Sequence, residues 1–470
     1  MNVRQLPAAA LWLVAAMLSL PKSSLAGQWP YLFADPLGAL PSVIEKGAIL
    51  PGDSLPIPRF VEKDFTRPLM LGEALDLALS NNQSVNMAWA DIKIQAGALG
   101  EAYAAYLPTV SGSVNYTKDY VGTTQSNRYT AQASLSWRLL DFGGRSANRR
   151  SAEDLLAAAL AGHDTTLQEV AGKVVRAYFD ALIAKASLTA KAKDEEIARH
   201  TLNSAKVREE MGVISQSDAL RATTALATAT LDKNRAQSDY RKSLAVLRLH
   251  LGLSGETALL LPADIDQQLG GEVERRELTL WLAEAQRNHP AIIRARKLYD
   301  ATQEQVTVIK SAGLPEVTLS GNYYLNTIPG GATTSGSERT VILGVTVPLF
   351  DGFASTYKLR GALAQAERKK AALAETEEQV AMEIVKAYAD TDSARLSLDS
   401  SAIIISSAQS ALAVSQRKYD KGAADITELL STQAALADAW NARARSLAEW
   451  NSARLLLLVN SAKLGRFALK

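Results

Sequence analysis

The chain contains 470 residues, of which 47% are hydrophobic and 21% are charged, a composition that excludes a largely disordered protein. Its 51 Lys and Arg residues nearly balance 49 Asp and Glu residues, which argues against nucleic acid as the main partner. The chain has no cysteine, so we expect neither disulfide bonds nor a lipid anchor attached through cysteine.

The N-terminal segment has the pattern of an exported protein. Arg4 precedes an almost wholly apolar run, Ala8 to Leu20, and Ser24-Leu25-Ala26 supplies the small residues that a signal peptidase reads. The alternative is a membrane anchor, but the apolar run is short for spanning a bilayer. We therefore expect residues 1–26 to be a signal peptide cleaved after Ala26, followed by an extended, proline-rich segment at 27–70. N-terminal sequencing of the exported protein would test this.

The rest of the sequence contains two similar copies. The stretch that begins at Leu71 matches the stretch that begins at Leu278, and Gly212 near the middle of the first copy matches Gly422 in the second. A copy of about 200 residues is too long for a solenoid repeat, so the pattern predicts a duplicated domain. The expected parts are a first copy at 71–270, a second copy at 271–465 and a tail at 466–470.

Each copy is expected to begin with a helix and to continue with two strands. Residues 71–105 place apolar side chains at helical spacing, and Pro108 ends that helix. Beyond Pro108 the apolar and small polar residues alternate with period two, which is typical of strands. The strands are expected near 109–121, 128–140, 316–327 and 339–349.

The strands resemble those of membrane barrels, because each is about ten residues long, apolar on one face and small and polar on the other. An ordinary sheet over a soluble core is the alternative, which the small number of strands disfavours. Arg138 falls on the polar face, so we expect it to face the lumen of a barrel. Five aromatic residues on the strands fit either a membrane-interface girdle or simple strand propensity: Tyr116, Tyr120, Tyr129, Trp137 and Tyr323.

Long helices follow the strands in both copies. Residues 145–211 contain no proline and predict a helix of roughly 100 Å. After a break at Gly212, Ser215 and Ser217 are candidate caps of a second helix at 218–250. The second copy predicts helices at 355–421 and 427–461. Such long, alanine-rich helices favour coiled-coil-like packing over a single globule.

This order of elements resembles the TolC-like family of outer-membrane efflux and secretion channels. The resemblance covers residues 70–465, and its motifs are Leu71–Asn82, Tyr106–Val110, Leu349–Gly352 and Arg417–Leu430. It implies a mainly α fold with a membrane β-barrel part. It also implies a homotrimer in which each copy gives four strands to a twelve-stranded barrel above an α-helical periplasmic tunnel.

The resemblance also implies two functional regions at the helix turns. Gly212, Val213, Gly422 and Ala423 would form periplasmic tips that meet an adaptor protein, although the glycines also simply permit a turn of the backbone.

The gate of the channel is expected just beyond the second tip. The family commonly has two acids there, three residues apart, and Glu428 occupies the first position while Ser431 occupies the second. Asp425 or Asp218 is expected to compensate. A ring of such carboxylates favours cations. The alternative for Glu428 is stabilisation of the helix dipole.

No catalytic, metal or cofactor pattern is apparent, so we expect a protein that is not an enzyme and has no cofactor. We expect as partners a periplasmic adaptor, outer-membrane lipid and an inner-membrane ABC transporter or RND pump. The first hypothesis is type I protein secretion, favoured because the chain lacks a lipid-anchor cysteine and because residues 33–40 resemble the cyclolysin-secretion subgroup. The second is a drug or small-molecule efflux duct, and the third is a periplasmic coiled-coil scaffold without a pore.

Overall fold

The structure is a computed structural model, and it describes residues 37–39, 67–122, 124–255, 257–262, 277–327 and 336–463. The expected signal peptide, most of the 27–70 segment and the tail at 466–470 lie outside the described residues. The chain divides into two compact units, and each draws on both copies of the repeat. The sheet unit is Met1–Pro41, Ile92–Ala158 and Arg296–Ala372, and the helical unit is Ser42–Asp91, Ala159–Ala295 and Leu373–Lys470.

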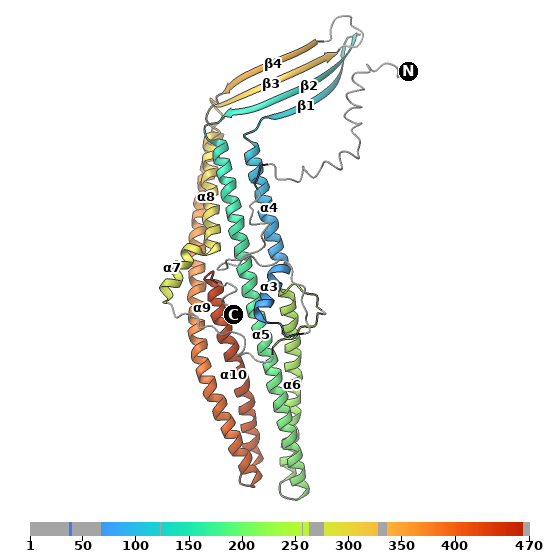
Figure 1. Cartoon of the computed structure of the whole chain (residues 1–470), viewed down its shortest axis with the longest axis vertical. Helices are drawn as coiled ribbons and strands as arrows, with labels where there is room; N and C mark the ends of the chain where they lie inside the picture. Colours follow the sequence, from blue (N-terminus) through green and yellow to red (C-terminus); the bar gives the residue numbers. More distant parts are fainter. Residues whose placement is uncertain are drawn as a thin grey trace, which may run out of the picture. The chain divides into compact units, whose positions relative to one another are not determined.

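The sheet unit contains the four strands that the sequence predicts, in one antiparallel sheet with the order β1-β2-β3-β4 (Figure 1). Their bounds are β1 Thr109–Val121, β2 Thr124–Leu140, β3 Glu316–Thr327 and β4 Gly336–Thr346. β2 begins four residues before its expected start, because Val121 pairs with Thr124 across a two-residue turn in which Gly122 has a φ of 60°. β4 ends at Thr346 instead of residue 349, just before Pro348, which has no N–H to donate.

The register gives the sheet two faces of different character, because residues paired across antiparallel strands share a face. Trp137 pairs with Leu319, and Ala133 pairs with Tyr323, which in turn pairs with Arg339. We call this the apolar face; all five of the aromatic residues noted in the sequence lie on it. The other side, the polar face, carries hydroxyl and amide groups, including those of Ser111, Ser134, Gln132, Thr318 and Asn322.

The helices of the two copies have equal lengths. α5 (Gly144–Glu210) and α9 (Ala354–Asp420) each contain 67 residues. α6 (Gln216–His250) and α10 (Ile426–Asn460) each contain 35. The bounds of these four helices agree with the sequence prediction to within two residues.

The prediction of one continuous helix at 71–105 is wrong. The segment forms two helices, α3 (Leu71–Asn81) and α4 (Gln83–Ala104). Asn82 is extended, with φ −70° and ψ 128°, and its Oδ1 accepts a hydrogen bond from the backbone N–H of Ser84 at 2.9 Å. Asparagine competes with helix in this way by offering the backbone a local acceptor.

The second copy repeats this break at the equivalent residue, His289. α7 (Leu278–Asn288) ends there and α8 (Pro290–Ser311) begins, with the same lengths of 11 and 22 residues as α3 and α4. The Nδ1 atom of His289 accepts a hydrogen bond from the backbone N–H of Ala291 at 3.2 Å, as Asn82 does for Ser84. Pro290 fits the first position of α8 because that position needs no N–H donor.

We expect His289 to make folding sensitive to acid. Burial lowers the pKa of His289 from 6.5 to about 4, and a hydrogen bond to the backbone of Asn460 opposes only part of that shift. A depressed pKa means that the folded state holds the neutral ring, whereas the unfolded state binds a proton more readily. The folded state therefore has its full stability above pH 6.5 and loses part of it as the pH falls towards 4. The loss should reach about 3 kcal/mol. Denaturant unfolding at pH 7.5 and pH 4.5 measures it.

The matched variant is His289→Asn, which installs the capping residue of the first copy and removes the titrating ring. Its free energy of unfolding should change less between the two pH values than that of the wild type. His200→Gln, which alters an exposed histidine of α5, is the control. An unchanged pH dependence in His289→Asn would contradict the prediction.

Hydrophobic clusters among the described residues hold the helical unit together. The largest surrounds Tyr178 and Phe179 of α5, whose rings meet edge to face with centroids 5.7 Å apart, and the Tyr178 hydroxyl donates to the backbone O of Leu69 at 2.9 Å. A second surrounds Trp281 and Ile384. Among the described helices, none combines the length and apolar character that a membrane crossing requires.

Candidate functional site

Both helix turns of the helical unit close with the same backbone motif. At the first tip, the N–H of Gly212 donates to the O of Glu209 and the N–H of Val213 donates to the O of Arg208, and Gly212 has a φ of 73°. This is a Schellman motif, in which the residue after the helix takes the left-handed conformation that glycine adopts without strain. The motif turns the chain sharply from α5 towards α6.

The second tip repeats the motif with residues of the second copy. The N–H of Gly422 donates to the O of Tyr419, the N–H of Ala423 donates to the O of Lys418, and Gly422 has a φ of 72°. No heavy atom outside the turn lies within 4 Å of the position that a Cβ would take on either glycine. The two glycines are therefore explained by backbone conformation.

Arg208 ties the first tip to the second. Its Nη1 donates to the backbone O of Tyr419 at 2.7 Å and its Nη2 donates to the backbone O of Asp420 at 3.2 Å. The guanidinium also lies over the Tyr419 ring, 4.4 Å from its centroid. Arg208 thus caps the C-terminal carbonyl groups of α9, where a positive charge is favourable.

A second arginine bridges the two helices that leave the tips. Arg221 of α6 donates from Nη1 to the hydroxyl of Thr427 on α10 at 3.1 Å, and its guanidinium lies 3.7 Å from the carboxylate of Asp218. Beneath these contacts lies a small apolar cluster that unites all four helix ends: Leu202, Ala205, Ala222, Tyr419, Ile426 and Leu429.

The structure brings the three expected gate residues into this region, where each has a local role. Asp218 caps α6 together with Ser215, whose hydroxyl accepts a hydrogen bond from the Asp218 N–H at 3.3 Å. Asp425 is the N-cap of α10, and hydrogen bonds from Thr427 hold the pKa of its carboxyl below the usual value. Glu428 lies in the first turn of α10, half exposed, with its Oε1 3.3 Å from the Nζ of Lys418.

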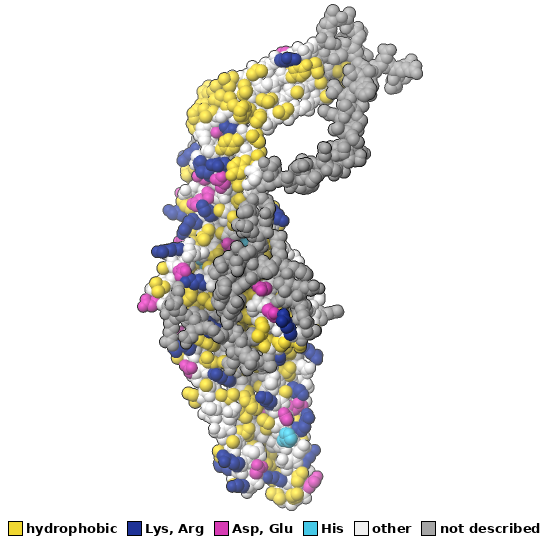
Figure 2. Space-filling view, viewed as in Figure 1, with side chains coloured by type: hydrophobic (Ala, Val, Ile, Leu, Met, Phe, Trp, Pro, Cys, Tyr) yellow, Lys and Arg dark blue, Asp and Glu magenta, His cyan; other side chains and the backbone are white. Residues whose placement is uncertain are grey.

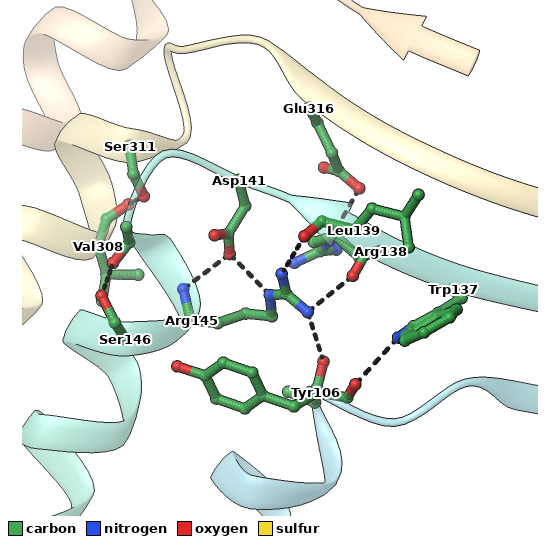
Figure 3. Close-up of polar contacts among 12 residues, drawn as sticks. Tyr106, Trp137, Arg138, Leu139, Asp141, Arg145, Ser146, Val308, Ser311 and Glu316 are labelled. Atoms are coloured by element: carbon green, nitrogen blue, oxygen red, sulfur yellow. Dashed lines mark hydrogen bonds and ion pairs between the residues drawn. The ribbon is translucent and has the colours of Figure 1, made fainter. Parts of the chain in front are cut away.

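The corner where β2 passes into α5 is built around Arg145 (Figure 3). The Arg145 side chain is only 11% exposed. Its Nη1 donates to the backbone O of Arg138 at 2.7 Å, and its Nη2 donates to the backbone O of Leu139 at 3.0 Å. The Asp141 carboxylate accepts from both the Arg145 backbone N–H at 2.7 Å and its Nε at 3.3 Å. One side chain thereby fixes the end of the strand and the start of the helix.

The equivalent corner of the second copy keeps the carboxylate cap but has no arginine at the matching position. Asp351 accepts from the backbone N–H of Ser355 at 2.7 Å, as Asp141 does for Arg145. Both corners use two successive residues with positive φ, and one of each pair is a phenylalanine, Phe142 or Phe353. The duplicated corners therefore share a backbone path while differing in how side chains hold it.

Arg138 lies on the polar face of the sheet, as the alternation predicts. Its Nε donates to Glu316 of β3 at 2.8 Å, and both side chains are partly exposed (Figure 3). Within the described residues, no group of three or more His, Cys, Asp and Glu side chains is arranged to hold a metal ion.

Sequence reasoning missed Arg145 and Arg208, although both do more in the structure than the residues it singled out. Arg208 and Tyr419 are 211 positions apart, so no local pattern connects them. The sequence did contain a signal for Arg145, because it lies four residues after Asp141 where the predicted strand passes into the predicted helix. That spacing permits an ion pair within the first helical turn.

A sheet with one apolar and one polar face, and long paired helices that end in matched tips, are consistent with an outer-membrane channel that extends into the periplasm. The sequence profile of the outer membrane efflux protein family matches residues 74–253 and 281–458, and the chain belongs to that family. The protein is thus an outer-membrane efflux channel and a non-enzymatic transport protein.

Individual relatives agree with this assignment. Protein CyaE of Bordetella pertussis is 33% identical over 435 residues, which is 91% of this chain and 90% of CyaE. The crystal structure of the outer membrane protein VceC from Vibrio cholerae aligns with a TM-score of 0.74 at 18% identity, covering 84% of this chain and 96% of VceC. The open state of the MtrE outer membrane channel of Neisseria gonorrhoeae aligns with a TM-score of 0.74 at 17% identity, covering 88% and 99%. These two structures establish the fold alone.

Proposed function

We propose that three copies of this chain form the outer-membrane exit duct of a tripartite export system. The observation that carries the proposal is the sheet, which has one apolar and one polar face. Its edge strands, β1 and β4, each have one side that pairs with no other described strand. Open edges are not tolerated in lipid, because unpaired backbone groups there cannot bond to water. Channels of this family form trimers in tripartite systems, and three copies would close a barrel of twelve strands. Arg138 would then face the lumen.

The transported cargo is proposed to be a protein, through type I secretion with an ABC transporter. The 33% identity to CyaE across nearly the whole chain supports this choice, together with the cyclolysin-secretion resemblance of residues 33–40. The competing proposal is a drug efflux duct served by an RND pump. Deleting the gene and scoring both protein secretion and drug susceptibility separates the two: loss of secretion alone supports the first, and drug sensitivity alone supports the second.

The direct test is the oligomeric mass of the purified protein in detergent, followed by its conductance in planar bilayers. A trimer with discrete, cation-biased conductance steps is the expected result. A monomer or dimer without conductance would overturn the barrel and favour a periplasmic scaffold without a pore.

The tips are proposed to contact the periplasmic adaptor. Val213 is well exposed beside Gly212, and Gly422 and Ala423 occupy the matching place on the second tip. Because the chain has no cysteine, the variant Val213→Cys carries a single thiol for crosslinking. We expect it to crosslink to the adaptor in membranes, whereas Met87→Cys on the exposed surface of α4 should not. Equal crosslinking at both positions would rule against specific tip contact.

Glu428 is proposed to set cation preference at the periplasmic end, with Asp425 and Asp218 contributing negative charge. Glu428→Gln removes the charge and leaves Lys418 without its partner, so cation selectivity should fall and block by divalent cations should weaken. Asp399→Asn, which removes an exposed carboxylate of α9 away from the tip, is the control. Unchanged selectivity and block in single-channel recordings of Glu428→Gln would leave only its helix-dipole role.

A further inference from the structure

Two basic residues lie on the otherwise uncharged apolar face of the sheet. Between residues 110 and 137 and along β3 and β4, the described residues of this face are hydrophobic, small or uncharged except for Lys118 and Arg339. Hydrophobic side chains gather over the strands near the corners (Figure 2). The polar face differs, because it carries charges of both signs: Asp119, Arg128, Arg138, Glu316 and Glu338.

Each of the two basic groups lies against a tyrosine. The Nζ of Lys118 is 5.1 Å from the ring centroid of Tyr120, and the Cζ of Arg339 is 5.4 Å from that of Tyr323. In the part of the chain that the structure describes, neither Lys118 nor Arg339 forms an ion pair with an acid. Arg138 on the polar face is different, because its charge is balanced by Glu316 at 2.8 Å. The apolar face therefore offers two cations without protein counter-charges.

The two cations also occupy corresponding places on the two edge strands. Lys118 lies three residues before the end of β1, and Arg339 lies three residues after the start of β4. Both are therefore close to the turn end of the sheet. If β4 of one copy pairs with β1 of the next, these two strands lie about 4.8 Å apart. Arg339 of one copy and Lys118 of the next then lie on the same face, on either side of the junction between the copies.

We propose that Lys118 and Arg339, with Tyr120 and Tyr323, bind the phosphate groups of a lipid headgroup at the turn end of the sheet. The proposal rests on the proposed function, in which the strands cross the outer membrane and copies join through β1 and β4. Lys binds phosphate as a point charge and Arg binds it through a planar fork, and both are favoured where an apolar surface meets anionic headgroups. Tyrosine belongs at the same boundary because its ring is apolar and its hydroxyl is polar.

The test measures lipid binding to the full-length assembly by native mass spectrometry, with diphosphoryl lipid A as the probe. Lys118→Gln/Arg339→Gln should bind the probe about tenfold more weakly than the wild type. The matched control is Arg128→Gln, which removes a cation at the same end of the sheet but on the polar face, and it should bind as the wild type does. Lys118→Arg/Arg339→Lys, which keeps both charges, should retain most of the binding.

Three outcomes would overturn the proposal: wild-type binding by the double Gln variant, equal loss in Arg128→Gln, or displacement of the lipid by millimolar inorganic phosphate. The last would identify a site for free phosphate. Conductance recordings of the same samples separate this inference from the proposed function. A conducting assembly whose double Gln variant binds diphosphoryl lipid A as the wild type does refutes only the lipid site, whereas a protein that is not trimeric and does not conduct refutes the duct.

Discussion

Replacing Arg145 by Ala should lower the free energy of unfolding by about 3 kcal/mol. The substitution removes hydrogen bonds from the backbone O of Arg138 and of Leu139 and leaves the Asp141 carboxylate without its nearest cation. The Arg145 side chain is 11% exposed, so water does not easily replace the hydrogen bonds that it supplied. Removing one partner of a partly buried, charged hydrogen-bond network leaves the other groups without a partner, which adds to the cost of the lost bonds. Unfolding of the purified protein in guanidinium chloride measures the change in free energy.

Arg149→Ala provides the control for Arg145→Ala. Arg149 lies one turn further along α5, its side chain is 38% exposed, and it pairs with Glu153 at 3.3 Å. Its loss should change stability by less than about 0.5 kcal/mol, which is typical of an exposed pair. If both variants lost the same stability, the corner would not depend on the clamp.

Replacing Arg208 by Ala should weaken the connection between the two tips. The side chain supplies two hydrogen bonds to the C-terminal end of α9 and a stacking contact with Tyr419, together worth about 2 kcal/mol. Amide hydrogen exchange in residues 415–425 should then become faster by about tenfold. In the proposed duct, the loosened tips should also raise single-channel conductance.

Two further variants make the Arg208 prediction specific. Arg208→Lys keeps the charge but cannot form the planar, two-pronged contact, so its exchange should be intermediate. Arg199→Ala removes an exposed arginine of α5 that pairs with Glu195 at 3.2 Å and should leave the tip unchanged. Wild-type exchange at the tip of Arg208→Ala would show that the apolar cluster around Leu429 alone holds the tips together.

Local patterns in the sequence predicted most of the secondary structure. The period-two alternation identified the strands, and Gly212 and Gly422 marked the tips because each must adopt a positive φ. The break at Asn82 was missed because helical apolar spacing continues across it, and only the hydrogen bond from Ser84 reveals the cap. Pro290 was a visible signal for the equivalent break in the second copy.

The candidate site was less accessible from sequence than the fold. Glu428 was noted because the family resemblance places acids just beyond the second tip, and Asp425 and Asp218 were noted as acids that compensate for Ser431. Two contacts at the tips depend instead on how the helices pack, which spacing along the chain does not encode: Lys418 of α9 with Glu428 of α10, and Arg221 of α6 with Thr427 of α10. The alternation assigned faces within a strand, but only the register placed Lys118 and Arg339 on the same face of the sheet.

The equal lengths of the paired helices imply that this protein tolerates substitution far better than insertion. A residue added within α9 would advance everything beyond it by about 1.5 Å and rotate it by roughly 100°. Tyr419 would then leave the cluster it shares with Leu202 and Leu429, and its backbone O would no longer accept the hydrogen bond from Arg208. The two copies differ in sequence but have helices of equal length, so helix length sets the level at which the tips meet. In relatives, insertions and deletions should therefore occur mainly in the segments that connect the helices. Where the length of a helix does change, the equivalent helix of the other copy should change by the same amount.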